Sequence, residues 1–170
     1  DPLTGAFNRR YFSEALDQEA ARSARENTPF SILILDVDHF KQFNDTYGHK
    51  CGDIVLQALA NFLNENTRQG DIVCRYGGEE FVILMTDVAS EAAYKRAELF
   101  RSNFENMTVK YEGKELKCTF SAGIASYPMH AGSGENLLIL ADQALYQSKA
   151  NGRNRVSIYS PESHHKILNK

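Results

Sequence analysis

Residues 75–85 constrain the fold of this chain more than any other stretch. Two glycines, two adjacent glutamates and an unbroken apolar run follow one another there. The glycines favour a tight reversal, because glycine alone takes positive φ angles at no steric cost. Residues 81–85 are all apolar, which predicts a strand buried on both faces. We therefore expect a β-hairpin whose turn presents Glu79 and Glu80 at the end of a buried strand.

The paired glutamates of this hairpin allow two interpretations. Two unit charges about 4 Å apart repel by roughly 4 kcal/mol at an effective dielectric near 20, so a buried acidic pair needs a compensating positive charge. The neighbouring glycines leave room for a ligand to approach the backbone. The hairpin is then a metal and phosphate site. An ordinary Gly-Gly hairpin with solvated glutamates is the alternative at this point.

A second pair of acids supports the metal interpretation. Residues 30–35 form another strand that is apolar on both faces, and Asp36, Val37 and Asp38 follow it directly. Ligands of proteins built from sheets and helices often bind at such strand ends. If this strand neighbours the hairpin, up to four carboxylates crowd one edge. Mg²⁺, with its preference for oxygen ligands, is the natural partner, and two such ions can assist phosphoryl chemistry.

The remaining patterns predict a single α+β domain. Apolar residues at helical spacing indicate helices over residues 8–25, 39–44, 53–66, 90–106 and 135–150. Strands are expected over residues 30–35, 72–76, 81–85, 109–111, 116–125 and 156–159. This order predicts a mainly antiparallel central sheet covered by helices. Its core would be a ferredoxin-like or polymerase-palm-like βαββαβ unit with an additional hairpin.

Composition narrows the class of protein. The net charge of -3 argues against binding nucleic-acid polymers or membranes through a basic surface. The three cysteines, without a CxxC pair, are expected to be reduced packing residues of a cytoplasmic domain. No apolar run approaches the about 20 residues that span a bilayer. Because the chain starts with Asp, we expect it to be part of a longer signalling protein, with residues 1–160 as its catalytic domain and 161–170 as a tail.

Several sequence blocks together resemble one family. The block RYGGEEF at residues 75–81 resembles the signature of the GGDEF family, the diguanylate cyclases, in its Gly-Gly-Glu-Glu-Phe form. DPLTG at residues 1–5, DVDHFK at 36–41, NDTYGH at 44–49, SAGIA at 121–125 and ADQALYQSKANGRN at 141–154 resemble further blocks of the family, in the same order. The resemblance covers about residues 1–160. Glu79 replaces the Asp of the family name, a variation that the family accepts.

The resemblance implies an activity and its partners. Two GTP molecules would condense into cyclic di-GMP with release of pyrophosphate, as each 3′-hydroxyl attacks the α-phosphate of the other nucleotide. Mg²⁺, with Mn²⁺ as a substitute, would act as two ions in each half-site. Each chain would hold one GTP, so catalysis would need a homodimer, which can be transient. The rival hypotheses are a catalytically silent module that senses GTP or cyclic di-GMP, and another palm-type cyclase or polymerase.

The resemblance also implies roles for individual residues. Asp36 and Glu79 would bind metal through their carboxylates and Val37 through its carbonyl, while Glu80 would either bind metal or help to deprotonate the 3′-hydroxyl. The substrate-binding residues would be the phosphate-facing backbone of His39, Phe40 and Gly78, the cations Lys41, Lys149 and Arg153, and Asn44, Asp53 and Leu3 around guanine.

Residue type alone allows simpler roles for some of these. Asn44 and Asp53 are also common helix caps, and Lys149 and Arg153 could complement the negative end of a helix. Asp38 is expected to orient neighbouring groups.

The segment Arg68-Gln69-Gly70-Asp71 matches the Arg-x-x-Asp pattern at the family's product-inhibition position. An exposed Arg/Asp turn is common, so the pattern draws its meaning from its place before the hairpin. There, Arg68 would grip phosphate or guanine edges and Asp71 would accept hydrogen bonds from guanine. We expect cyclic di-GMP to bind this turn and restrain turnover.

Overall fold

The computed structural model describes residues 1–161; the expected tail lies outside the described residues beyond Pro161. In chain order the elements are β1 (Phe7–Asn8), α1 (Arg9–Glu26), β2 (Phe30–Val37), α2 (Phe40–Tyr47), α3 (His49–Asn66), β3 (Ile72–Gly77), β4 (Glu80–Met85), α4 (Ser90–Asn106), β5 (Val109–Tyr111), β6 (Lys114–Leu116), β7 (Phe120–Tyr127), α5 (Gly134–Ala150) and β8 (Val156–Ile158).

The centre of the molecule is a mixed sheet with the strand order β1-β3-β4-β2-β7-β8. The four inner strands pair antiparallel, whereas β1 and β8 add parallel edges. The inner order β3-β4-β2-β7, with α3 and α4 as connections, is the predicted βαββαβ core. The predicted α+β fold with a mainly antiparallel sheet is thus confirmed.

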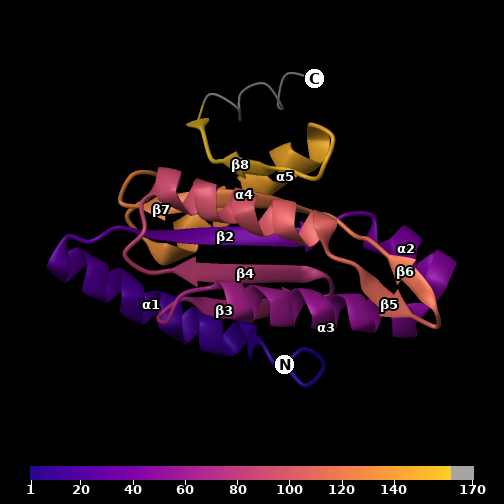
Figure 1. Ribbon diagram of the computed structural model, residues 1–170. Helices are drawn as coiled ribbons and strands as arrows, with labels where there is room; N and C mark the ends of the chain where they lie inside the picture. The colour runs from indigo at the N-terminus through magenta and orange to yellow at the C-terminus, as the bar shows by residue number, and fades with distance from the viewer. Residues whose placement is uncertain (162–170) are drawn as a thin grey trace.

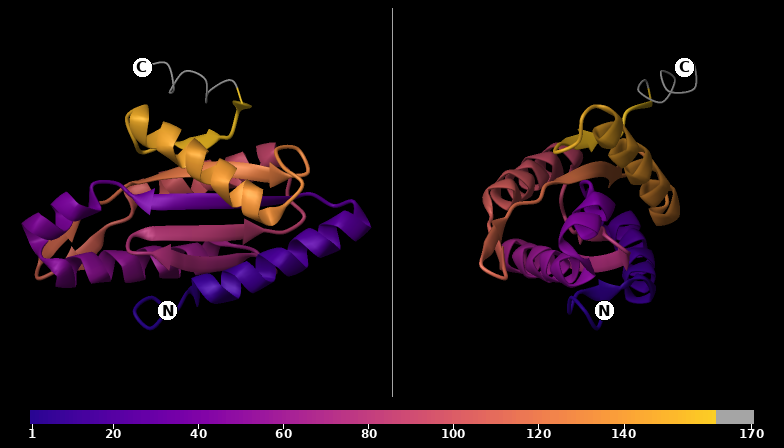
Figure 2. Two further views of the ribbon diagram at one scale, coloured as in Figure 1. Left: turned by 180° about the vertical axis from the view of Figure 1, so that it is seen from behind. Right: turned by 90° about the vertical axis from the view of Figure 1, so that its right-hand side faces the viewer.

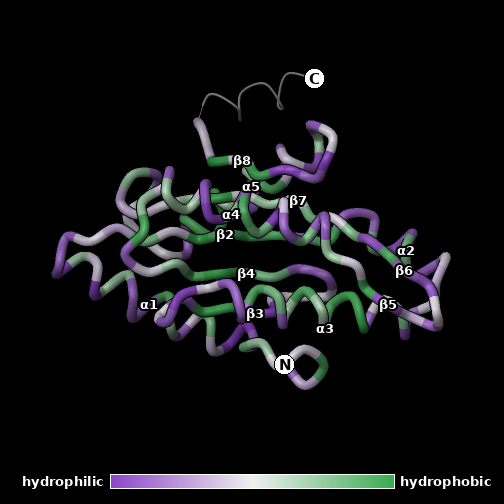
Figure 3. The backbone as a smooth tube through the Cα atoms, in the orientation of Figure 1, coloured by the Kyte–Doolittle hydropathy of each residue, from purple (hydrophilic) through white to green (hydrophobic). Residues whose placement is uncertain are grey.

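Helices cover both faces of this sheet. Helices α3 and α4 lie over one face (Figure 1), and α1 and α5 lie over the other (Figure 2). Each pair closes its own apolar cluster, one around Leu59, Ile83 and Phe120 and the other around Phe12 and Ile32. All eight residues of β2 are buried, because this strand lies between the two clusters. Figure 3 shows the resulting hydrophobic centre, with hydrophilic residues along the outer sides of the helices.

Three local differences from the expected elements have physical reasons. Helix α3 begins at His49, four residues before the expected start at residue 53. Gly48, with a φ of 85°, both ends α2 and precedes the first residue of α3, so no longer loop separates the two helices. The additional hairpin pairs Val109 with Leu116 around Glu112 and Gly113, both with positive φ, and forms a separate two-stranded sheet. The strand expected from residue 116 into residue 125 is therefore divided, and β7 starts only at Phe120. The two-residue strand β1 was not predicted.

Candidate active site

The acids from two strands meet at one edge of the sheet, as the sequence predicted. Asp36, near the end of β2, is the direct partner of Glu80 at the start of β4. The backbone N–H of Val37 donates to the Glu79 carbonyl at 3.4 Å, so the Gly-Gly-Glu-Glu turn lies against the end of β2. Register, rather than sequence proximity, brings these groups together across the sheet.

Asp36 is a mostly buried carboxylate with one cation beside it. Its Oδ1 lies 3.0 Å from Nζ of Lys149, in the last turn of α5. Burial raises the pKa of Asp36, Lys149 opposes that shift, and the charges of Glu79 and Glu80 add to it. The ionised form of Asp36 therefore needs a positive charge nearby, and the partly exposed Lys149 provides one.

Asp38 belongs to a different environment. Its carboxylate accepts hydrogen bonds from Thr119 Oγ1 and Ser121 Oγ, each at 2.7 Å, and from the backbone N–H of Asn154 at 3.0 Å. The expectation that Asp38 orients its neighbours agrees with this arrangement. The expectation that up to four carboxylates crowd the edge is wrong, because neutral donors in β7, directly before it and in the segment after α5 hold Asp38.

The donor set still suits a magnesium ion. Within residues 1–161, no three His, Cys, Asp or Glu side chains gather into a metal-binding group. Mg²⁺ does not require one, since it usually takes one or two carboxylates and fills its remaining positions with water and substrate phosphates. Asp36 and Val37 at the end of β2, with Glu79 in the turn beside them, offer such a partial set of oxygen ligands.

Backbone donors lie next to these acids. His39 takes a φ of 57° and opens α2 without a side-chain cap, so the first N–H groups of the helix have no intrahelical partner. Such a helix start favours anions. Across from it, Gly78 is exposed, and a side chain added there would meet no atom within 4 Å. Lys41, in the first turn of α2, is exposed beside these donors.

Arg75 fixes the glycine turn, a role that sequence reasoning missed. Its Nε and Nη2 donate to the Gly78 carbonyl at 3.0 and 2.8 Å, and its Nη1 donates to Asp1 at 3.1 Å. An arginine three residues before the second glycine could have indicated a bond across the turn. Its other partner, Asp1, is distant in the sequence and could not be predicted from it.

The predicted guanine residues flank the junction of α2 and α3. Asn44 lies inside α2 and Asp53 inside α3, so the alternative that they cap helices is wrong. Asn44 Oδ1 is buried without a hydrogen-bond partner. It packs so closely on Gly52 that a Cβ there would lie 1.9 Å away. Leu3 is held nearby, because its carbonyl accepts from Gln57 Nε2 at 3.0 Å.

The remaining predicted cation of the active site follows α5. Arg153 is half-buried and takes a φ of 62°, in the loop between α5 and β8. Lys149 pairs with Asp36 across elements, so its role is more than the expected alternative of complementing a helix end.

Arg68 and Asp71 lie apart from this constellation, at the opposite end of β3 from the glycine turn. The length of β3 places the turn at Arg68 and Asp71 roughly 20 Å from the glycine turn. Arg68 is exposed. The Asp71 side chain is buried and accepts from Arg96 on α4 and from the backbone N–H groups of Arg68 and Thr86.

None of the helices of residues 1–161 is long and apolar enough to cross a membrane.

Comparison with known proteins places the chain. Residues 1–155 match the family model described as "Diguanylate cyclase, GGDEF domain". Diguanylate cyclase A of Treponema denticola is 43% identical over 136 residues, which cover 80% of this chain but 37% of that protein. The chain thus spans about a third of that relative's length.

Solved structures agree in fold. The GGDEF domain of TpbB (YfiN) from Pseudomonas aeruginosa superposes with a TM-score of 0.94 at 31% identity, covering 100% of this chain and 99% of that one. The GGDEF domain of DgcB from Caulobacter crescentus, in complex with c-di-GMP, gives 0.88 at 34% identity and covers 94% of each chain. This chain belongs to the GGDEF family of diguanylate cyclase domains.

Proposed function

We propose that this domain condenses two GTP molecules into cyclic di-GMP with release of two pyrophosphates. The observation that carries the proposal is the register of β2 and β4, which pairs Asp36 with Glu80. The turn with exposed Gly78 and the uncapped first turn of α2 lie beside this pair. The similarity to diguanylate cyclases supports the same reaction.

Asp36, Glu79 and the Val37 carbonyl would hold the divalent metal, Mg²⁺ or Mn²⁺, as two ions in each half-site. When bound, the metal would supply positive charge that stabilises the attacking and leaving oxygens. Lys149 would then turn from Asp36 toward the substrate, because a metal ion on this carboxylate replaces the positive charge that it needs and repels the ammonium group. Burial of Asp36 supports this exchange, since a buried carboxylate needs one of the two.

The triphosphate would lie between α2 and the glycine turn. The N–H groups of His39 and Phe40 and the open backbone at Gly78 would contact its oxygens, with Lys41, Lys149 and Arg153 neutralising its charge. In each step of the reaction, the 3′-oxygen of one GTP forms a bond to the α-phosphorus of the other. The bond from that phosphorus to the oxygen shared with the β-phosphate breaks, and pyrophosphate leaves with this oxygen. Glu80 would accept the proton of the 3′-hydroxyl or join the metal ligands.

Guanine specificity would come from two side chains. The Asp53 carboxylate would accept hydrogen bonds from the ring N–H and the amino group of guanine, which adenine cannot donate at the same positions. Asn44, with its unpaired buried oxygen, would complete this recognition, and Leu3 would pack against the base.

Two chains would have to face each other, since each holds one GTP. Glu80 lies at a cavity of about 250 Å³ that Ile139 and Leu138 of α5 line with apolar surface. Exposed apolar surface next to a half-site supports a second copy as the transient partner.

Product inhibition would act at Arg68 and Asp71. Exposed Arg68 would contact cyclic di-GMP. Asp71 would contribute by fixing the turn through its bond to the Arg68 N–H, because its carboxylate already has three protein donors.

The test is to incubate the protein at low and high concentration with Mg²⁺ and either GTP or ATP, and to separate the products by chromatography. Cyclic di-GMP from GTP, with a rate per chain that rises with protein concentration, is expected. Binding of GTP without any product would favour the silent sensing module, and a linear product or turnover of ATP would favour another palm-type enzyme.

A further inference from the structure

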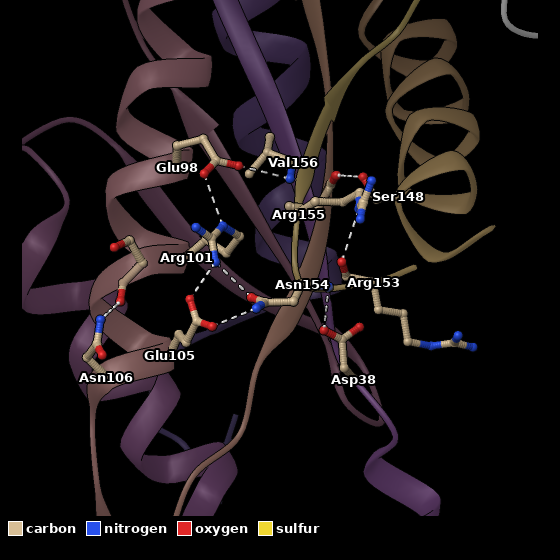
Figure 4. A network of polar contacts seen from close by, with 12 residues as sticks. Asp38, Glu98, Arg101, Glu105, Asn106, Ser148, Arg153, Asn154, Arg155 and Val156 are labelled. Carbon is tan, nitrogen blue, oxygen red and sulfur yellow. Dashed lines mark hydrogen bonds and ion pairs between the residues drawn. The ribbon is translucent and has the colours of Figure 1, made fainter. Parts of the chain in front are cut away.

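The loop that carries Arg153 is held in a costly backbone conformation. Arg153 and Asn154 take φ angles of 62° and 46° in succession, and neither is glycine. The left-handed region costs a residue such as Arg153 roughly 1–2 kcal/mol, and Asn154 less because Asn enters it more readily, so such a pair persists where the surroundings fix it. The surroundings here come from α4 and from Asp38, directly after β2, which are both distant in the sequence (Figure 4).

Asn154 makes the three bonds that tie this residue pair to α4 and to Asp38. Its Oδ1 accepts from Arg101 Nη1 at 2.8 Å, and its Nδ2 donates to Glu105 at 2.8 Å. Its backbone N–H donates to Asp38 at 3.0 Å. The amide side chain is therefore satisfied on the α4 side and the backbone on the β2 side, which leaves the residue one orientation.

Arg101 is the centre of the α4 side. Besides Asn154, it donates to Glu98 at 3.0 Å and to Glu105 at 2.8 Å, and its side chain is mostly buried. Glu98 in turn accepts the backbone N–H of Val156 at 3.1 Å. The Arg101 guanidinium and its two carboxylate neighbours thus hold both ends of residues 154–156.

The Arg153 side chain points the other way. Figure 4 shows it extending away from the Arg101 group on the opposite side of the loop. Its backbone N–H donates to the Ser148 carbonyl at 3.0 Å, so the same loop is tied to the last turn of α5, which carries Lys149. These bonds therefore fix the Arg153 backbone, and with it the point and direction from which its side chain leaves the loop, although that side chain makes none of them.

We propose that Arg101 is a positioning residue for nucleotide binding: through Asn154 it aims Arg153 at the triphosphate. The inference rests on the proposed function for the place of GTP, but not on turnover. Arg101 itself would never touch the substrate. Losing it would free the two left-handed residues to relax, and Arg153 would then spend part of its time away from the phosphates.

The test is a double-mutant cycle on nucleotide affinity. The probe is a GTP analogue with a methylene bridge between the α- and β-phosphorus, which binds but cannot release pyrophosphate, titrated calorimetrically with Mg²⁺. Arg101→Ala should weaken its affinity by about 5-fold in the otherwise native chain, and by less than about 2-fold when Arg153 is already Ala. Equal losses in both backgrounds, or no loss in the native chain, would overturn the proposal.

Two further variants separate positioning from stability. Asn154→Gly accepts the positive φ without strain but lacks the amide, so it should match Arg101→Ala even if the latter folds poorly. Arg22→Ala is the matched control, because Arg22 makes the same kind of bonds on α1, to Glu19, Glu26 and Asp87. It should lower the melting temperature while leaving analogue affinity unchanged; a loss of affinity equal to that of Arg101→Ala would contradict positioning.

The cycle also keeps the two proposals apart. A chain that binds the analogue with the expected coupling, yet makes no cyclic di-GMP from GTP, would overturn the proposed reaction and support the role of Arg101.

Discussion

Two carboxylates of this domain are each buried beside a single cation from a helix, yet they are built for different purposes. Asp36 has a side chain 12% exposed and pairs with Lys149, which is 32% exposed. Asp71 has a side chain 1% exposed and pairs with Arg96, which is 13% exposed. Asp71 also accepts two backbone N–H groups.

The difference lies in how easily each carboxylate can change partner. Lysine is a point charge on a flexible stem, whereas arginine is a planar fork that holds a carboxylate in fixed geometry. Lys149 can withdraw into solvent, and Asp36 would then be free for a metal ion. Asp71 has no comparable freedom among the contacts of residues 1–161, since it is enclosed by donors. The first pair suits an exchange of ligands, and the second suits a fixed turn.

Asp36→Asn should give the largest effect. It removes a metal-binding carboxylate while keeping the shape of the side chain, so formation of cyclic di-GMP should fall by more than about 100-fold. The melting temperature should change little, because a neutral amide replaces a charge that burial disfavours. Product formation and thermal unfolding are measured together. The control is Asp45→Asn on the exposed side of α2; activity retained by Asp36→Asn would refute the assignment.

Asp71→Asn should instead act on stability. It leaves the buried Arg96 guanidinium, whose Nη1 has no partner even now, without its only carboxylate contact in the described chain. Breaking a buried ion pair from one side costs about 3–5 kcal/mol, which urea unfolding would reveal. Lys149→Gln is the counterpart: its amide can still donate to Asp36, so we expect a smaller loss of stability than for Asp71→Asn, together with weaker GTP binding. Equal losses of stability would abolish the contrast between the two sites.

The strands that carry these acids were predictable from the sequence, whereas the cation beside each acid was not. Unbroken apolar runs predicted the strands over residues 30–35 and 81–85, and the structure supplied the register that pairs Asp36 with Glu80. The partners of Asp38 and Asp71 were not expected, because Ser121 and Arg96 come from other elements and carry no local signal. Periodicity identifies which residues are buried, but not which distant polar group satisfies them.

The additional hairpin and the Arg101 group show the same limit. Leu116, Cys118 and Phe120 alternate as one strand would, yet Leu116 pairs with Val109 and Phe120 with Val37. The alternation could not show that two different partners divide the run. Arg101 reads in sequence as an ordinary helix-surface ion pair with Glu105, and Asn154 is far along the chain.

Arg68→Ala tests the proposed inhibitory site at Arg68 and Asp71, in which Arg68 is the exposed residue. A charge-assisted contact to a phosphate or a guanine edge contributes roughly 1.5–3 kcal/mol, so the concentration of cyclic di-GMP that halves the rate should rise by about 10-fold or more. The initial rate without added product should stay near that of the native chain. An inhibition curve unchanged by the substitution would remove Arg68 from the inhibitory site, and Arg25→Ala, an exposed arginine at the end of α1, is the control.

The smallest effect concerns the pH dependence of Asp36 in metal-free protein. Burial, the main cause, raises its pKa above the ordinary value of 3.8, so the folded chain binds this proton more tightly than the unfolded chain does. The stabilisation that follows is present below pH 3.8 and is lost as the pH rises through the higher pKa of the folded state. The native chain should therefore lose stability relative to Asp36→Asn as the pH increases from that value toward neutrality. Urea unfolding of both proteins with EDTA measures the difference, and Mg²⁺ with nucleotide should reduce it, because a bound cation favours the ionised carboxylate. A difference that is constant with pH would mean that Lys149 already compensates Asp36 fully, and that this pair is as permanent as the one at Asp71.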